Sequence, residues 1–219
     1  MSSSPLAAFS TCELSDALVK LNVPNGGHLS GLESISPTSP VRICGPAYTV
    51  KMVWAHDDDA PRPQNHFVDT APRGSIIIID APISARNAVW GGLMTAGAQA
   101  RGAAGVIVSG RCRDLAEQRS ANFAVFARGH STLGQSPFTR PSEINIPLRL
   151  SPGDDTFSVS VSPQDWIVAD EDGVVCVPRE LESQVVDLAN KGRHIDALCL
   201  ADIQQGVSVE VAFKTHRST

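Results

Sequence analysis

The chain has 219 residues and a formal net charge of −5 at pH 7; 42% of its residues are hydrophobic and 19% are charged. This length and balance are typical of one soluble globular domain. The acidic charge, without any run of Lys or Arg, argues against a general nucleic-acid binder, and no apolar run approaches the length of a membrane span.

The cysteines and the N-terminal residues bear on the compartment in which the protein works. Its five cysteines are dispersed and form no CxxC pair, which indicates free thiols in a reducing compartment rather than a zinc site or a disulfide framework. The N-terminal residues lack the basic region that opens a signal peptide. We therefore expect a cytoplasmic protein without membrane contact.

The N-terminal part predicts a helix, a turn, a long strand and a loop. Ser10 and Glu13 have the spacing of a capping box, so a helix begins there. Residues 25–27 predict a turn, and the β-branched residues within 41–54 predict a strand. The polar, proline-containing residues 55–72 predict a surface loop.

The middle of the chain alternates apolar strands with helices. Strands are expected at 74–80, 105–109 and 123–127, and helices at 92–101 and 114–120. The continuous apolar character of these strands indicates burial on both faces. Strands and helices that alternate in this way predict a parallel sheet with right-handed crossovers.

The first of these two helices is rich in small residues. We expect the face made by Leu93, Ala96, Gly97 and Ala100 to pack closely on the sheet. Gly102 is placed to end the helix in the left-handed conformation.

The C-terminal part predicts shorter strands and a helical end. Residues 129–141 are rich in Gly, Ser and Pro and predict a loop. Strands are expected at 146–150, 157–161, 166–169 and 174–177. The last two form a hairpin, and a helix follows Pro178 and continues or restarts over 195–203. The pattern predicts a single mixed α/β domain with a core at about 12–190 and a helical extension at 191–219.

A glycine turn at the start of the first predicted helix is the first candidate site. In Gly91-Gly92-Leu93-Met94, no Cβ blocks the approach of a ligand to the first two residues. The first N–H groups of a helix lack internal partners and favour an anion such as a carboxylate or a phosphate. The alternative is a tight turn that only allows close packing.

The second candidate is the Arg113-Asp114 pair, which follows the next strand after Gly110. Both candidates should therefore emerge at the same edge of the sheet, where ligands of open α/β sheets collect. Arg offers a planar cation suited to carboxylate or enolate oxygens, and Asp can hold Mg²⁺. The alternative is that Asp114 caps the following helix and Arg113 makes a surface ion pair. The shared edge favours a site for an acid and a metal.

These segments occur in an order that resembles one known family. In chain order they are SDAL (15–18), GPAYTV (45–50), GSIIIID (74–80), GGLM (91–94), RGAAGVIVSGRCRD (101–114), FAVFARG (123–129), EINIPL (143–148) and DEDGVVCVP (170–178). The order resembles the class II pyruvate aldolases of the 4-hydroxy-4-methyl-2-oxoglutarate aldolase type, a family that includes the bacterial regulator of ribonuclease E activity. The resemblance runs from about Cys12 to about Leu188, and HFVD (66–69) is most similar to fungal members.

The resemblance implies a fold, an assembly and a reaction. The fold is a single swivelling β/β/α domain with a mixed, partly parallel central sheet. The assembly is a homotrimer or a dimer of trimers with its sites at subunit interfaces. The implied reaction is retro-aldol cleavage of a small 4-hydroxy-2-oxo acid to pyruvate and a second keto acid, with oxaloacetate decarboxylation as a side activity.

The resemblance also implies a role for each candidate residue. The N–H groups of Leu93 and Met94 bind the carboxylate of the pyruvyl group, next to Gly91 and Gly92. Arg113 binds the 2-keto oxygen and stabilises the enolate. Asp114 anchors Mg²⁺ or Mn²⁺, whose remaining ligands are largely water and substrate.

The chain departs from this pattern at position 92. The bacterial aldolases carry an acidic residue there, thought to position a catalytic water, whereas this chain has Gly92. The route of the proton is therefore open. The pattern also includes an acidic residue from the C-terminal region of a neighbouring subunit, for which Glu180, Glu182 and Asp187 are candidates.

Other residues have weaker functional readings. His66 and His130 are candidate acid–base groups, with simple exposure in a loop as the favoured alternative. Asn87 and Trp90 are candidates to line the pocket, although a packing or interface role is favoured for Trp90. Arg111 is a candidate partner for an acidic substrate tail or, equally, a surface residue. We do not expect Cys112 to act as a nucleophile, because no histidine base is recognisable beside it.

Two alternative functions remain on the sequence alone. One is a non-catalytic binding protein like the family's ribonuclease regulator, which lacks the intact metal-binding aspartate that Asp114 supplies here. The other is a family member recruited to another reaction of a keto or hydroxy acid, an alternative that Gly92 keeps open.

Overall fold

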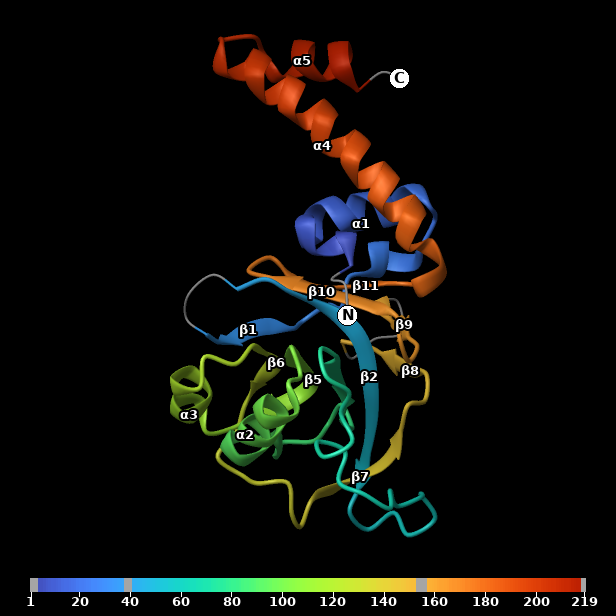
Figure 1. Ribbon diagram of the computed structural model, residues 1–219, viewed down its shortest axis with the longest axis vertical. Coiled ribbons are helices and arrows are strands. Elements are labelled where there is room, and N and C mark those ends of the chain that lie inside the picture. The colour runs from blue at the N-terminus through green and yellow to red at the C-terminus, as the bar shows by residue number, and fades with distance from the viewer. Residues whose placement is uncertain (1–3, 38–40, 153–156, 218–219) are drawn as a thin grey trace.

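The protein is built on one large mixed sheet, shown in Figure 1 as a computed structural model that describes residues 4–37, 41–152 and 157–217. Its centre is four strands, β2 (Ile43–Trp54), β3 (Ile76–Asp80), β5 (Gly105–Cys112) and β6 (Val125–His130). They are parallel and neighbours in the order β6-β5-β3-β2. The predicted parallel core is confirmed.

Antiparallel strands extend this core on both sides. β1 (Glu33–Ser36) pairs with β6, and β7 (Thr139–Ile144) pairs with the second half of β2. The hairpin of β10 (Trp166–Asp170) and β11 (Gly173–Val177) joins the first half of β2. The expected hairpin is therefore confirmed as an extension of the mixed sheet.

Short elements complete the strands. β4 (Ala88–Trp90) pairs in parallel with the end of β5. β8 (Leu148–Leu150) and β9 (Val159–Val161) form a separate antiparallel pair. β4 matters for the site, because the glycine turn follows it directly.

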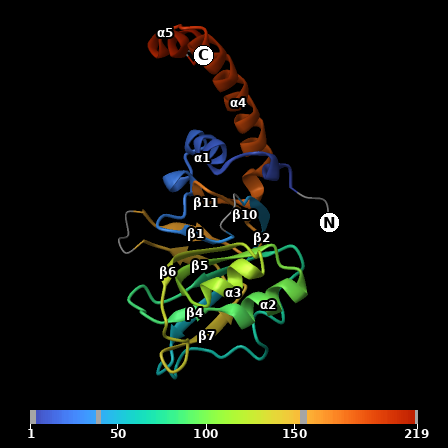
Figure 2. The same cartoon turned by 90° about the vertical axis from the view of Figure 1, so that its left-hand side faces the viewer.

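The helices lie in two groups. α2 (Gly92–Arg101) and α3 (Leu115–Ser120) lie side by side on one face of the sheet, as Figure 2 shows. α1 (Thr11–Lys20) packs against α4 (Glu182–Gln204), which runs away from the sheet and carries α5 (Val209–His216) at its far end (Figure 1). Single 3-10 turns occupy Pro5–Ala8, Pro24–Gly27 and Arg179–Leu181.

The helix ends follow the chemistry that the sequence indicates. The Ser10 and Glu13 side chains form the expected capping box at the start of α1. Gly102 ends α2 with φ 74°, as predicted. α4 continues without a break through residue 191, where a C-terminal extension was expected to begin, and over 195–203.

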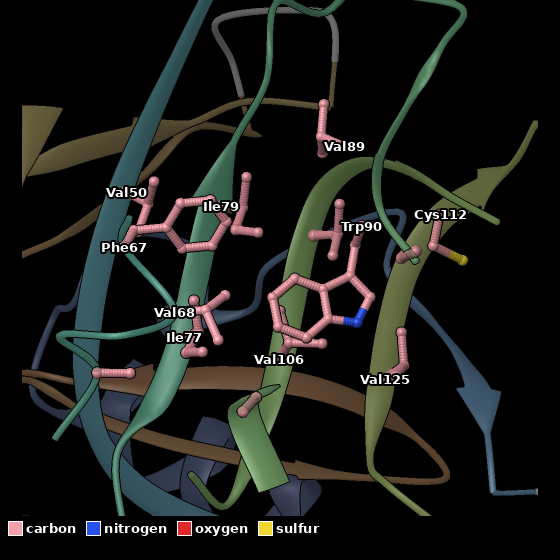
Figure 3. Close-up of a cluster of buried hydrophobic side chains, with 14 of the residues drawn as sticks. Val50, Phe67, Val68, Ile77, Ile79, Val89, Trp90, Val106, Cys112 and Val125 are labelled. Carbon is pink, nitrogen blue, oxygen red and sulfur yellow. The ribbon is translucent and has the colours of Figure 1, made fainter. Parts of the chain in front are cut away.

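A buried aromatic cluster lies beneath the start of α2. Trp90 is 2% exposed, and its ring centroid lies 6.4 Å from that of Phe67 and 6.4 Å from that of Phe123. Figure 3 shows Trp90 and Phe67 within this cluster. The ring Nε1–H of Trp90 donates to Thr95 Oγ1 at 2.9 Å. Burial of a large aromatic side chain stabilises a fold by about 2–3 kcal/mol. Trp90 therefore anchors the residues just before the glycine turn.

The structure corrects the predicted packing face of α2. Thr95 and Ala98 are buried against the sheet, whereas Leu93 is 83% exposed. Ala96 and Ala100 are also exposed. The helix is rotated relative to the expectation because the hydroxyl of Thr95 has a buried partner in Trp90, so that a polar residue occupies the inner face.

The structure also corrects the loop predicted at 129–141. β6 extends through Gly129 to His130, and β7 begins at Thr139. β1 and β4 were not predicted either. β1, β4 and β7 are short or carry polar residues. They are strands because they pair with neighbouring strands, and their own hydrophobic pattern does not indicate it.

Two further expectations concern the cysteines and the membrane. All five cysteines are free, as predicted. Within the described ranges, none of the helices combines the length and apolar character that crossing a bilayer requires.

Candidate active site

The glycine turn at the start of α2 forms one side of the site. Gly91 is the N-cap residue and has no side chain with which to cap the helix. The N–H groups of Leu93 and Met94 belong to the first turn, where N–H groups have no acceptor within the helix. The Gly92 N–H donates to Asp114 Oδ2 at 3.0 Å. The turn thus offers N–H groups to an anion at the positive end of the helix dipole.

The Arg113-Asp114 pair lies directly beside this turn. Trp90 of β4 pairs with Cys112 of β5, and the Arg113 N–H donates to the Trp90 carbonyl oxygen at 2.9 Å. The two segments that the sequence singles out are therefore brought together at one edge of the sheet.

Asp114 has a backbone conformation that directs its side chain toward α2. Its φ of 61° and ψ of 45° are left-handed, and its side chain does not cap α3. A Cβ atom on Gly91 would lie 2.5 Å from Asp114 Oδ2, so glycine leaves the space that this carboxylate fills. Asp114 thus occupies the N-cap position of α3, but its side chain makes no capping hydrogen bond there.

Arg113 lies over the same carboxylate and remains accessible. Its Nε is 3.6 Å from Asp114 Oδ2, and the Arg113 and Asp114 side chains are 47% and 34% exposed. An ion pair this open contributes little to stability, roughly 0–1 kcal/mol. Both side chains are thus free to interact with a ligand.

A cavity of about 480 Å³ opens at this point. It is lined by His66, Ala88, Val89, Trp90, Gly91, Leu93, Met94, Arg113, Asp114, Gly134, Gln135 and Ser136. The cavity joins the N–H groups of the α2 turn with a fixed cation and a carboxylate. Its size suits a small organic acid.

The other sequence candidates divide between the cavity and its surroundings. His66 and Trp90 line the cavity. His66 Nδ1 accepts a hydrogen bond from the Val68 N–H at 3.3 Å. Asn87 does not line the cavity as expected, because its buried side chain donates to Thr139 Oγ1 at 2.8 Å.

Arg111, His130 and Cys112 lie outside the cavity lining. Arg111 Nη1 donates to the His130 carbonyl oxygen at 3.0 Å, so this guanidinium is held by the backbone of β6. Burial raises the pKa of the Cys112 thiol to about 11, which agrees with the expectation that it is no nucleophile.

Sequence reasoning missed one charged residue beside the cavity, Glu117. Residues 134–136, within the predicted loop, line the cavity, and a Cβ on Gly134 would lie 2.8 Å from Arg113 Nη1. The carboxylate of Glu117, in the first turn of α3, lies against Gly92. The only sequence signal for Glu117 is its spacing of three residues after Asp114.

The donor set around Asp114 is compatible with a magnesium ion that keeps most of its waters. The described residues contain no group of three or more His, Cys, Asp or Glu side chains that could enclose a metal ion. Mg²⁺ is commonly held by only one or two carboxylates, with water and substrate oxygens as its other ligands. Asp114, part-exposed at the cavity, fits that kind of site, whereas a zinc site closed by protein ligands does not fit.

A second cavity of about 440 Å³ has a different character. Its lining includes Lys51, Asp80 and Ser109, which lie side by side on β2, β3 and β5. Burial raises the pKa of the Asp80 carboxyl to about 6, against the opposing effects of Lys51, Ser109 and Arg128. This cavity contains none of the residues that the sequence singles out.

Comparison with known proteins identifies the family. A sequence model of the RraA-like family, described as Aldolase/RraA, matches residues 11–176. The chain belongs to the RraA-like family, and its mixed α/β fold is the fold of that family.

Relatives with assigned names come from bacteria and plants. The chain is 31% identical over 168 residues to a protein provisionally named 4-hydroxy-4-methyl-2-oxoglutarate aldolase from Halalkalibacterium halodurans, covering 74% of this chain and 75% of the relative. An Arabidopsis thaliana protein with the same provisional name, number 3, is 30% identical over 80% of this chain and 99% of its own length. Protein DlpA of Legionella pneumophila is 30% identical over 92% of this chain, which spans only 31% of DlpA.

Solved structures show the same fold. A protein of uncharacterised function from Pseudomonas syringae superposes with a TM-score of 0.76 at 26% identity, covering 94% of both chains. RraAS2 of Streptomyces coelicolor, described as an unusual member of the RNase ES inhibitor RraA family, gives a TM-score of 0.76 at 23% identity, with 88% of this chain and 91% of RraAS2 covered.

Proposed function

We propose that the protein is a divalent-metal-dependent lyase that cleaves small 4-hydroxy-2-oxo acids, of the 4-hydroxy-4-methyl-2-oxoglutarate type, to pyruvate and a second keto acid. Oxaloacetate decarboxylation is the expected side activity. The observation that carries the proposal is the convergence of the α2 turn, Arg113 and Asp114 on one cavity. The names of the relatives support a lyase.

The α2 turn binds the acid end of the substrate. The N–H groups of Leu93 and Met94 hold the carboxylate of the pyruvyl group at the positive end of the α2 helix dipole. The exposed Leu93 side chain supports this role, because it points away from the sheet and leaves the turn open.

Arg113 stabilises the charge that develops during bond breaking. When the C3–C4 bond breaks, its electron pair moves into an enolate whose negative charge is largely on the 2-keto oxygen. A guanidinium that stays protonated at every working pH stabilises this oxygen in a preorganised site. None of the four lysines, Lys20, Lys51, Lys191 and Lys214, lines the cavity, so the proposal needs no Schiff base.

Asp114 is the residue that would hold the metal. Mg²⁺ or Mn²⁺ bound there supplies Lewis-acid polarisation of the 2-keto acid. The Gly92 N–H fixes the orientation of the Asp114 carboxylate by donating to Oδ2, while the side chain remains part-exposed toward the cavity.

We further propose that the chain works as a homotrimer or homohexamer and that a neighbouring subunit contributes to the site. In a single chain the Arg113 and Asp114 side chains are 47% and 34% exposed, which leaves surface at the site for a neighbouring subunit to cover. Light scattering of the purified protein gives its mass in solution, and a monomeric, fully active protein would contradict the proposal.

A non-catalytic regulatory protein is the second candidate. The likeness to RraAS2, a member of a family of ribonuclease inhibitors by its description, favours this alternative. Recruitment to another reaction of a keto acid is a third candidate, since position 92 is glycine. Both alternatives predict no release of pyruvate from the proposed substrates.

The test is a coupled assay of pyruvate release from 4-hydroxy-4-methyl-2-oxoglutarate and from oxaloacetate, with Mg²⁺ and then with EDTA. We expect turnover that EDTA abolishes and that Arg113→Ala and Asp114→Ala each remove. Arg119→Ala, at an exposed position on α3, is the matched control that keeps its activity. Absence of turnover on both substrates, or full turnover in EDTA, would refute the proposed function.

A further inference from the structure

The space above Gly92 is occupied by a carboxylate. A Cβ atom on Gly92 would lie 1.7 Å from Glu117 Oε2 and 2.8 Å from Glu117 Cδ. Gly92 is not among the glycines with a positive φ, so its backbone does not require glycine. The requirement for glycine comes from Glu117, because the Glu117 carboxylate occupies the position of a Cβ atom on residue 92.

The same relation recurs at two neighbouring glycines. A Cβ on Gly91 would lie 2.5 Å from Asp114 Oδ2, and a Cβ on Gly134 would lie 2.8 Å from Arg113 Nη1. Gly91 and Gly134 make room for two charged groups that line the cavity, and Gly92, between the lining residues Gly91 and Leu93, makes room for Glu117 beside it. Glu117 is thus the third charged group that packs on this glycine framework.

α3 holds Glu117 in this position. The Gln118 side chain is fully buried, and its Nε2–H donates to the Arg113 carbonyl oxygen at 2.7 Å. This bond ties the start of α3 to the end of β5. Glu117 is exposed to solvent, and its side chain makes no hydrogen bond or ion pair with another described residue. Its carboxylate is therefore available to a ligand.

The proposed cleavage needs a group that moves a proton, and the residues assigned so far do not provide one. Arg113 does not release its proton at working pH. Asp114 accepts the Gly92 N–H and lies beside the Arg113 guanidinium. Glu117 is the carboxylate that lies beside the same turn without such an engagement.

We propose that Glu117 is the proton-transfer residue of the site. As the C3–C4 bond breaks, the Glu117 carboxylate takes the proton of the C4 hydroxyl, directly or through one water. The O–H electron pair becomes the second bond of the new C4 carbonyl, and the C3–C4 pair becomes the enolate held by Arg113. The protonated Glu117 then returns the proton to C3, which gives pyruvate and restores the carboxylate.

This inference rests on the proposed function, and it distinguishes two reactions at the same site. Oxaloacetate loses CO₂, so no hydroxyl proton has to be removed, and its enolate can take a proton from solvent. Retro-aldol cleavage does require that removal. A general base contributes roughly 10²–10⁴-fold to a rate. Loss of Glu117 should therefore affect the two reactions unequally.

The first experiment compares Glu117→Gln with the wild-type protein on both substrates. We expect kcat for aldol cleavage to fall by roughly 100-fold or more with little change in KM, whereas oxaloacetate decarboxylation falls by less than about 10-fold. Glu171→Gln, at an exposed glutamate of the β10–β11 turn, is the matched control. Thermal unfolding monitors the integrity of each variant.

The second experiment moves the carboxylate to the other residue. In the double variant Gly92→Asp/Glu117→Ala, the truncated residue 117 leaves room for a side chain on residue 92. We expect this variant to cleave the aldol substrate faster than Glu117→Ala alone. The single variant Gly92→Ala should lose aldol cleavage, because its Cβ displaces Glu117.

The outcomes separate this inference from the proposed function. If the wild-type protein turns over neither substrate, the proposed function fails. If the wild-type protein is active and Glu117→Gln retains both activities or loses both equally, then Glu117 has no proton-transfer role and serves only the helix N-terminus. A selective loss of aldol cleavage in His66→Asn instead of Glu117→Gln would overturn the assignment in favour of His66, which lines the cavity.

Discussion

Replacing Asp114 with Asn and with Ala separates the chemistry of its carboxylate from the conformation of its backbone. The residue has φ 61° and ψ 45°, a left-handed conformation that Asn tolerates and Ala does not. Asn also keeps an oxygen that can accept the Gly92 N–H. The two substitutions therefore remove the same negative charge but disturb the fold to different extents.

The expected magnitudes follow from these contacts. Asp114→Asn exchanges a charge-assisted hydrogen bond for a neutral one, which lowers the free energy of unfolding by about 1 kcal/mol. Asp114→Ala loses the bond of 3.0 Å to Gly92 altogether and adds left-handed strain of about 1–2 kcal/mol, for a total of about 2–3 kcal/mol. Turnover should fall by more than about 100-fold in both variants, because each loses the anionic metal ligand.

Urea unfolding measures the stabilities, and the coupled pyruvate assay with Mg²⁺ measures the turnover. Asp58→Asn, in the exposed loop before β3, is the matched control. Turnover at the wild-type level in Asp114→Asn would refute the role of the carboxylate. Equal stability of the Asn and Ala variants would refute the conformational reasoning.

Three further predictions concern other groups. Arg113→Lys should lower kcat by at least about 10-fold, because a lysine ammonium lacks the planar fork of the guanidinium. Steady-state kinetics measure this change, and an unchanged kcat would contradict the prediction. Gly134→Ala should raise KM without lowering thermal stability, since its Cβ would lie 2.8 Å from Arg113 Nη1 and displace the guanidinium; an unchanged KM would contradict this. The Asp80 carboxyl has a pKa raised by burial from 3.8 to about 6, so its contribution to stability is greatest below pH about 4 and is lost as the pH rises through about 6. Asp80→Asn should therefore raise the free energy of unfolding at pH 8 by up to about 3 kcal/mol. Urea unfolding at pH 4 and pH 8 measures this effect, and the same effect at both pH values would contradict the prediction.

The parts of the fold that carry strong local signals could be predicted from the sequence. The capping box of Ser10 and Glu13, the buried parallel strands and the end of α2 at Gly102 all match the structure. Each depends on side-chain chemistry or periodicity within a few residues. The existence and type of these elements were therefore encoded locally.

The elements that depend on distant partners could not be predicted in this way. β4 has only three residues, Ala88–Trp90, and is a strand because it pairs with β5. The inner face of α2 was misassigned because the burial of Thr95 depends on a hydrogen bond from Trp90. Neither fact has a periodic pattern in the sequence.

The candidate site shows the same division. The glycine turn and the Arg113-Asp114 pair could be singled out because both follow apolar strands, and the structure brings them together. The position of Glu117 could not be foreseen, because it is defined by the space that the missing Cβ of Gly92 leaves. A contact of this kind can be recognised only in the folded structure.

The most direct test of the proposed site is a crystal structure of the protein with Mg²⁺ and oxalate, an analogue of the pyruvate enolate. We expect one oxalate carboxylate to accept the N–H groups of Leu93 and Met94, a second oxygen to contact Arg113, and the metal to be bound by Asp114. Oxalate bound only in the cavity of Lys51 and Asp80, or metal bound without Asp114, would contradict the central claim.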